Sequence, residues 1–334
     1  MRAWVIPTLI IILIEYVAAL SIGAAVGFNY SIPFVTFAVL GLFIGGSCIA
    51  AAIVTLLGLY AWQEEPRPAR RLLAYRPRFT SFFLGVVFVT AQMGVLMWLK
   101  IMLPIATPFW ADPLLAALDH RLFGVDPWRL THDLFGWASP LIDRAYVTWT
   151  PAKFATLALV LAFPEGRRKT QAIIAYFLMV STAALGQYLL SSGGPVFYQM
   201  LGLGDRFVDL PIEPWVETTR AYLWSDYLRS GGKIGGGISA MPSLHVAVSL
   251  WIALVVRSYV PKASLVGWTY FGLIFVGSIH LGWHYALDSI AAVVLALLAW
   301  AVACWIASRS WRSLPAAEPM AAQPSLARGV SPQA

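Results

Sequence analysis

The stretch that decides the fold is Ser278–Asp288, SIHLGWHYALD, which places His280, His284 and Asp288 four residues apart between two long apolar runs. Ionisable side chains at a membrane boundary are costly to bury, so they are functional candidates. A second histidine, His245, follows the segment AMPSL where another apolar run begins. Both motifs therefore predict a site at the start of a membrane helix.

The composition is typical of a membrane protein. Of the 334 residues, 59% are hydrophobic and only 12% are charged, and the mean hydropathy is +0.73. A soluble domain has roughly a quarter of its residues charged. Cys48 and Cys304 both lie in apolar runs, so neither a structural disulfide nor a cysteine metal cluster is expected. The first apolar run begins close to Met1 and is read as an uncleaved span.

Apolar runs of about 20 residues are long enough to cross a bilayer as a helix. We therefore expect an all-α integral membrane protein with eight transmembrane helices and interfacial helices in the outer segment 111–142. A second outer segment, 192–243, is also long enough to have structure and is richer in Gly, Pro and charge. The expected domains are two accessory helices with a basic inner loop (1–79), a six-span catalytic core (80–308) and a disordered inner tail (309–334). The eight runs are at residues 3–27, 33–62, 80–106, 144–163, 171–191, 244–260, 264–281 and 285–307.

The basic residues predict the orientation. Clusters such as Arg67–Arg78 and Arg167–Lys169 lie in short loops, and the positive-inside rule then puts both termini in the cytoplasm. A bacterial inner membrane is the expected location. The net charge of +7 is largely explained by this topology, so no nucleic-acid partner is expected, and no obligate protein partner is evident.

This topology places the candidate residues on one face. His245 begins the sixth span, and His284 and Asp288 begin the eighth, and both spans enter the membrane from outside. Gly194 and Pro195 close the fifth span on the same side. The orientation was derived from the basic residues alone, without these motifs. Because it places all the motifs on the same side of the membrane, we expect a single site on the outer face.

The motifs fit phosphoryl transfer. Ser243 is a good N-cap for a helix that begins with His245, and free N–H groups at a helix start attract phosphate. His284 and Asp288 are expected on one helix face, where the carboxylate fixes the imidazole tautomer. We assign His284 as a nucleophile that forms a phosphohistidine, Asp288 as its orienting group and His245 as the acid for the leaving oxygen.

The segments PSLH at 242–245 and HYALD at 284–288 resemble the last two motifs of the type 2 phosphatidic acid phosphatase superfamily. They are most similar to the branch that contains fungal inositol phosphorylceramide synthase. The resemblance covers roughly residues 80–308 and implies a six-span core that needs no metal or other cofactor. It also implies a site on the extracytoplasmic face that acts on a phospholipid or polyprenyl phosphate in the bilayer.

The chain departs from the family pattern at the phosphate-binding cations. The first motif aligns with Gln187 and Gly194, and the Ser-Arg pair of the third motif falls on Gly277-Ser278. A weaker cationic clamp would suit a singly charged diester, which favours a transferase that moves a phosphoinositol-type head group. The candidate substrate-binding residues are Ser243, Tyr285, Lys233, Lys153, Arg229, His280 and Gly194.

Several alternatives stay open. A phosphatase acting on a lipid phosphate or polyprenyl diphosphate would share the phosphohistidine. Glu15 and Lys100 lie inside predicted spans, where snorkelling or a hydrogen bond is expected, but they also motivate a transporter or flippase. An inactive scaffold of the same fold is a third alternative. His280 has a structural alternative as well, and a zinc site with His284 and Asp288 is excluded because eight helical residues rise about 12 Å.

Overall fold

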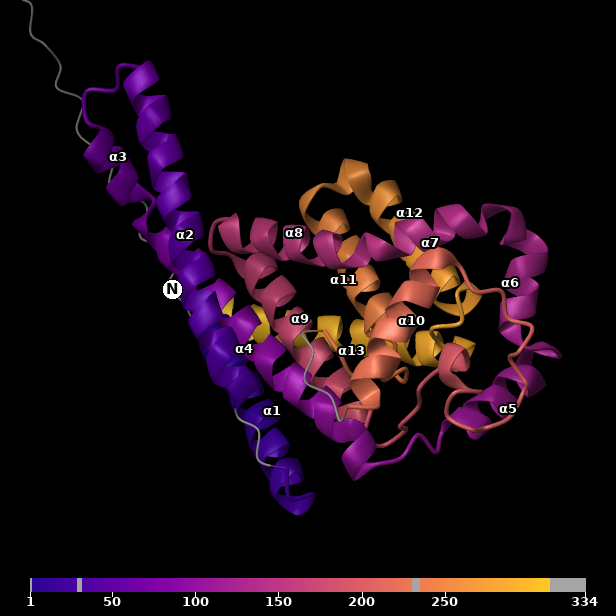
Figure 1. Cartoon of the computed structure of the whole chain (residues 1–334). Helices are drawn as coiled ribbons and strands as arrows, with labels where there is room; N and C mark the ends of the chain where they lie inside the picture. Colours follow the sequence, from indigo (N-terminus) through magenta and orange to yellow (C-terminus); the bar gives the residue numbers. More distant parts are fainter. Residues whose placement is uncertain (1, 29–31, 230–234, 313–334) are drawn as a thin grey trace, which may run out of the picture.

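The computed structural model describes residues 2–28, 32–229 and 235–312. Every regular element in these ranges is helical (Figure 1). The helices in chain order are α1 (Val5–Ala25), α2 (Ile32–Trp62), α3 (Pro68–Ala74), α4 (Arg76–Ala106), α5 (Asp112–Phe123), α6 (Pro127–Phe135), η1 (Gly136–Ala138), α7 (Ser139–Val147), α8 (Trp149–Ala162), α9 (Arg167–Gly186), η2 (Pro195–Phe197), α10 (Pro214–Tyr227), α11 (Leu244–Tyr259), η3 (Pro261–Ala263), α12 (Ser264–His280) and α13 (Ala286–Arg312).

Within the described ranges, five helices are long and apolar enough to cross a membrane, namely α1, α2, α4, α12 with its preceding turn η3, and α13. The segment Pro127–Val147 (α6, η1 and α7) and the helix α8 make a sixth span if they are counted as one, with a bend of 40° between them. Pro151 contributes to this break because it has no N–H to donate to the carbonyl of Val147. The chain is an integral membrane helical protein, but α9 and the 16-residue α11 do not meet the same test, so eight spans stay a prediction.

The accessory helix α2 lies along α4 (Figure 1). Two glycines of α2, one helical turn apart, permit this close approach. A Cβ at Gly41 would lie 1.9 Å from Oγ1 of Thr90, and a Cβ at Gly45 would lie 2.9 Å from the ring of Phe83. Small residues at this spacing let membrane helices pack backbone to backbone. On the other side, α1 packs against α4 and α9.

The centre of the bundle is formed by α9, α11 and α13. The indole of Trp251 on α11 is fully buried and donates a 2.8 Å hydrogen bond to the carbonyl of Ala172 on α9. Helix α13 presents a stripe of small side chains to this core, which lets it approach its neighbours closely. The buried alanines of the stripe are Ala292, Ala296, Ala299 and Ala303.

A second apolar cluster lies at the end of the bundle formed by α5, α6, α7, α10 and η2 (Figure 1). Phe197 of η2 and Tyr285, which precedes α13, are both buried in it. Helices are present in the segment 111–142, for which the sequence predicted them, and the segment 192–243 contains η2 and α10. This cluster brings the segment after α9 against the start of α13, and so positions the motifs described below.

Candidate functional site

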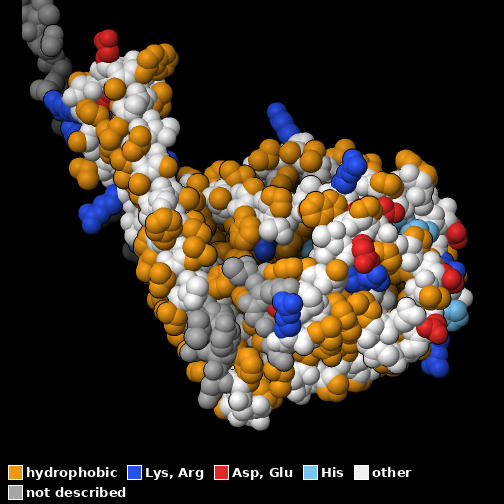
Figure 2. Space-filling view, in the orientation of Figure 1, with side chains coloured by type: hydrophobic (Ala, Val, Ile, Leu, Met, Phe, Trp, Pro, Cys, Tyr) orange, Lys and Arg blue, Asp and Glu red, His pale blue; other side chains and the backbone are white. Residues whose placement is uncertain are grey.

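A cavity of about 670 Å³ lies between α4, α7, α8, α9, α10 and α11. Figure 2 shows it as a hollow bordered by hydrophobic side chains, with basic atoms visible inside. Ligand pockets of roughly 300–1,000 Å³ are typical of small-molecule sites. The cavity is therefore large enough for a lipid head group together with part of its apolar chain.

The stretch Ser278–Asp288 is not one continuous helix. Helix α12 ends at His280, Gly282 has a φ of +70°, and α13 begins at Ala286. The positive φ favours glycine here, and a Cβ at this position would lie 2.2 Å from Cδ2 of Leu210, so the leucine side chain would have to shift. The expected helical row of His280, His284 and Asp288 is therefore wrong.

His284 and Asp288 nevertheless face one another across the start of α13. The His284 Nδ1 atom lies 3.6 Å from Oδ2 of Asp288, and the two side chains are 5% and 0% exposed. The same Oδ2 accepts the backbone N–H of Tyr285 at 2.9 Å, which holds the carboxylate in place. Because Nδ1 faces Asp288, the Nε2 atom is the one available to a substrate.

His245 approaches the same cavity from α11. Its ring packs between Tyr146 and Trp149, with centroid distances of 4.9 and 4.3 Å. The centroid of the His245 ring is 5.8 Å from that of His284, and both residues line the cavity. The two imidazoles therefore border the same space. The two histidines lie 39 positions apart in the sequence, and the fold brings them together.

The local structure at the start of α11 is the one that the sequence predicted. Ser243 is the N-cap, and its Oγ accepts the N–H of Val246 at 3.3 Å. Ser243 also donates its own backbone N–H to the carbonyl of Asp288 at 3.2 Å. This bond ties the first turn of α11 to that of α13, so the two histidine motifs are held next to one another.

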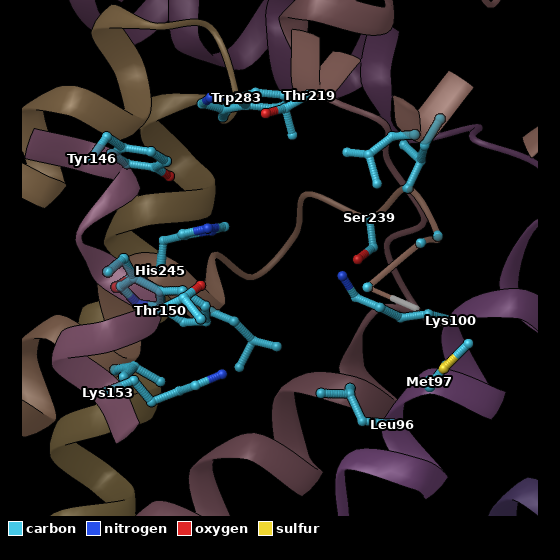
Figure 3. Close-up of a pocket in the computed structure, with 18 of the residues that line it drawn as sticks. Leu96, Met97, Lys100, Tyr146, Thr150, Lys153, Thr219, Ser239, His245 and Trp283 are labelled. Atoms are coloured by element: carbon cyan, nitrogen blue, oxygen red, sulfur yellow. The ribbon is translucent and has the colours of Figure 1, made fainter. Parts of the chain in front are cut away.

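Two lysines point into the cavity from opposite walls, Lys100 from α4 and Lys153 from α8 (Figure 3). The Nζ of Lys153 lies 4.4 Å from the centroid of the Trp149 ring, in a cation–π contact. Neither lysine forms an ion pair with a carboxylate among the described residues. The hydroxyl of Ser239 is buried without a hydrogen-bond partner in this part of the chain, and it lies near Lys100 in the same view.

Lys100 is a site residue that sequence reasoning did not select. Its position in the sequence predicts a place inside a span. In the structure it lies only six residues before the end of α4 at Ala106. That end is on the same side as the starts of α11 and α13. Its place near the end of the span was the signal, and Lys100 and Lys153 are both cations that line the cavity.

Asp112 on α5 anchors the segment after α9, a role that the sequence did not reveal. Its two carboxylate oxygens accept the backbone N–H groups of Gly193 and Gly194 at 2.8 and 2.9 Å. Its Oδ1 also accepts the hydroxyl of Tyr285 at 2.8 Å. Burial raises the pKa of Asp112 to about 6, and the three hydrogen bonds oppose that rise.

Asp119, two helical turns further along α5, caps α13. Its carboxylate accepts the N–H groups of Ala286 and Leu287 at 2.6 and 3.1 Å. Burial raises its pKa to about 6 as well. These first-turn N–H groups of α13 are therefore already satisfied and are not free to bind phosphate.

Several predicted substrate-binding residues lie outside the cavity. His280 turns away from it, with Nε2 2.8 Å from Oγ of Ser139 and its ring stacked 3.8 Å from that of His132. Arg229 is exposed at the end of α10 and does not line the cavity. Lys233 lies outside the described residues. The remaining three have structural roles: Ser243 as N-cap, Tyr285 as donor to Asp112, and Gly194 as donor to Asp112.

Comparison with known protein families identifies the superfamily of the chain. The family model described as the PAP2 superfamily matches residues 113–302, which include His245, His284 and Asp288 and leave out Lys100. Searches of curated proteins and of solved structures returned no match. The matched range is more than half of the 334 residues, and the chain therefore belongs to the PAP2 superfamily.

Proposed function

We propose that this protein is a lipid phosphotransferase or lipid phosphatase that works through a phosphohistidine on His284. Membership of the PAP2 superfamily supports the reaction class. The observation that carries the assignment is the arrangement of His245 and His284, 5.8 Å apart, in a cavity that also holds Lys100 and Lys153. Two imidazoles and two cations around one space meet the needs of phosphoryl transfer.

In the first step, Nε2 of His284 attacks phosphorus and the bond from phosphorus to the leaving oxygen breaks. The leaving oxygen takes a proton from His245, and Asp288 stabilises the positive charge that develops on the attacking imidazole. Lys100 and Lys153 neutralise the phosphoryl oxygens. In the second step, His245 removes a proton from water or an alcohol, whose oxygen attacks phosphorus and releases His284.

The two lysines change the argument about the substrate. The first motif lacks the phosphate-binding cations of the family pattern, and this favoured a singly charged diester as the substrate. That argument holds only if no other cations line the site. With Lys100 and Lys153 in the cavity, a monoester and a diester are both accommodated. The acceptor then decides the outcome: water gives a phosphatase, and inositol or a lipid hydroxyl gives a transferase, including transfer of a phosphoinositol-type head group.

We place the site on the outer face of a bacterial inner membrane, with both termini inside. The basic helix α3 lies at the opposite end of the molecule from α5, α6 and α10 (Figure 1), as expected if the positive end is cytoplasmic. The lipid bilayer would then supply the substrate directly.

The test is to incubate the purified protein in detergent with labelled phosphatidic acid, phosphatidylinositol and polyprenyl phosphates, each with and without inositol. We expect a released or transferred phosphoryl group and an acid-labile phosphate on the protein. His284→Ala should abolish both, whereas His120→Ala, a substitution of an exposed histidine on α5, should not. Movement of lipid across vesicles that survives His284→Ala, without turnover, would instead identify a transporter.

A further inference from the structure

The inner end of the cavity is polar, although it lies among membrane helices. Gln92 of α4 and Tyr176 of α9 line it, and they are only 1% and 3% exposed. Gln92 precedes Lys100 by eight residues, which places it about 12 Å further along the helix axis. Polar side chains at this depth are costly unless they are paired or serve a function.

The amide nitrogen of Gln92 is fully engaged behind the cavity wall. It donates to Oε2 of Glu15 at 3.3 Å, to the carbonyl of Phe177 at 3.0 Å and to Oγ of Ser181 at 2.8 Å. The hydroxyl of Ser181 donates to the same Glu15 oxygen. These contacts fix the orientation of the amide and leave its oxygen as the atom without a hydrogen bond to the described residues.

Tyr176 has a free polar atom at the same place. Its ring packs against Trp251 with a centroid distance of 5.3 Å, and its hydroxyl makes no hydrogen bond within the described ranges. The floor of the cavity therefore offers a ligand one acceptor, the Gln92 oxygen, and one hydroxyl that can donate or accept.

The accessory helix α1 takes part in this arrangement. Glu15 is fully buried and comes from α1, and both Glu15 and Gln92 lie outside the residues 113–302 that the family model matches. The polar floor therefore involves segments outside the matched family range. Helix α1 therefore contributes to this polar end of the cavity through Glu15, in addition to covering the core.

We infer that Gln92 and Tyr176 form a subsite for a hydroxyl group or amide N–H carried by the apolar part of the lipid substrate. This inference rests on the proposed function, because it takes the phosphate to lie between Lys100, Lys153 and the histidines. A hydrocarbon chain or an ester carbonyl at this depth leaves the Gln92 oxygen unpaired, and a buried acceptor without a donor is costly. A chain with a hydroxyl or N–H at the matching depth satisfies it.

The test compares phosphatidic acids whose acyl chains are palmitoyl, 2-hydroxypalmitoyl or 3-hydroxypalmitoyl, which differ only in one hydroxyl per chain. For the full-length wild-type protein we expect kcat/KM to favour one hydroxylated lipid by roughly 3- to 10-fold, the range of one neutral hydrogen bond. In Tyr176→Phe and Gln92→Met the ratio should fall toward one. Thr182→Val, on the exposed face of α9, is the matched control and should keep the wild-type ratio.

A wild-type ratio near one for both hydroxylated lipids, or a preference that persists in Tyr176→Phe and Gln92→Met, would overturn the subsite. If the wild type releases no phosphate from any lipid, the proposed function fails separately. The subsite is then tested by lipid binding to the His284→Ala variant. Binding is measured as the shift that each lipid causes in the thermal unfolding midpoint of this variant. A larger shift with the hydroxylated lipid that is lost on adding Tyr176→Phe supports the subsite, and equal shifts refute it.

Discussion

The hydroxyl of Tyr285 donates a 2.8 Å hydrogen bond to Asp112, and the same carboxylate accepts the N–H groups of Gly193 and Gly194. One buried side chain of α5 thus joins the segment after α9 to the residue that follows His284 in the chain. The outer helix α5 is therefore part of the framework of the site, although it contributes no side chain to the cavity.

The first prediction concerns this junction. Tyr285→Phe removes one of the three hydrogen bonds to Asp112 and should lower the free energy of unfolding by about 1 kcal/mol. Asp112→Ala strands two backbone N–H groups and the tyrosine hydroxyl, so we expect a loss of about 2–5 kcal/mol. Denaturant unfolding of the purified protein in detergent measures both values. Equal losses for the two variants would contradict the central role of the carboxylate.

The second prediction concerns Asp288, the partner of the proposed nucleophile His284. Asp288→Asn keeps the shape of the side chain but removes the negative charge that faces Nδ1 of His284, 3.6 Å away. Turnover should fall by about 10²- to 10⁴-fold, with a much smaller change in KM. Steady-state kinetics on the substrate found by the lipid panel gives the result, and wild-type turnover in this variant would refute the assigned role.

The third prediction separates function from stability at the lysines. Lys100→Met and Lys153→Met should each raise KM or lower kcat/KM by about 10- to 100-fold, because a charge-assisted contact to phosphate is lost. The thermal unfolding midpoint should stay the same or rise, since a buried cation without a carboxylate partner is removed. Lys262→Met, in the predicted inner loop, is the control for both measurements. A fall in stability with unchanged kinetics would assign the lysines a structural role.

The fourth prediction concerns pH. Burial raises the pKa of both Asp112 and Asp119 to about 6, above the ordinary value of an aspartate. The folded protein therefore holds these protons more tightly than the unfolded chain, and their contribution to stability should grow as the pH falls from 7 toward 4. Unfolding midpoints at pH 7 and pH 5 should show that wild type gains relative to Asp112→Asn and Asp119→Asn. Asp209→Asn, an exposed control, should follow the wild type.

Local features of the site followed from the sequence. Ser243 is an N-cap because its short polar side chain can reach the N–H of Val246 whatever the surroundings are. The motif residues His245, His284 and Asp288 meet in one region, as the direction of the apolar runs and the placement of basic loops predicted. The boundary between the spans at 264–281 and 285–307 was predicted, but not the turn that makes it, since a glycine within an apolar stretch does not show by itself whether its φ is positive.

The sequence by itself determined the helical membrane class and which motifs lie at the starts of α11 and α13, because hydropathy, capping and charge act over a few residues. Only the tertiary structure decided that Lys100 faces Lys153 across a cavity, that His280 turns away, and that Asp112 and Asp119 occupy backbone N–H groups otherwise available to phosphate. These outcomes depend on how helices distant in the chain pack together. Which partner satisfies a buried polar group is set by that packing, and no local pattern encodes it.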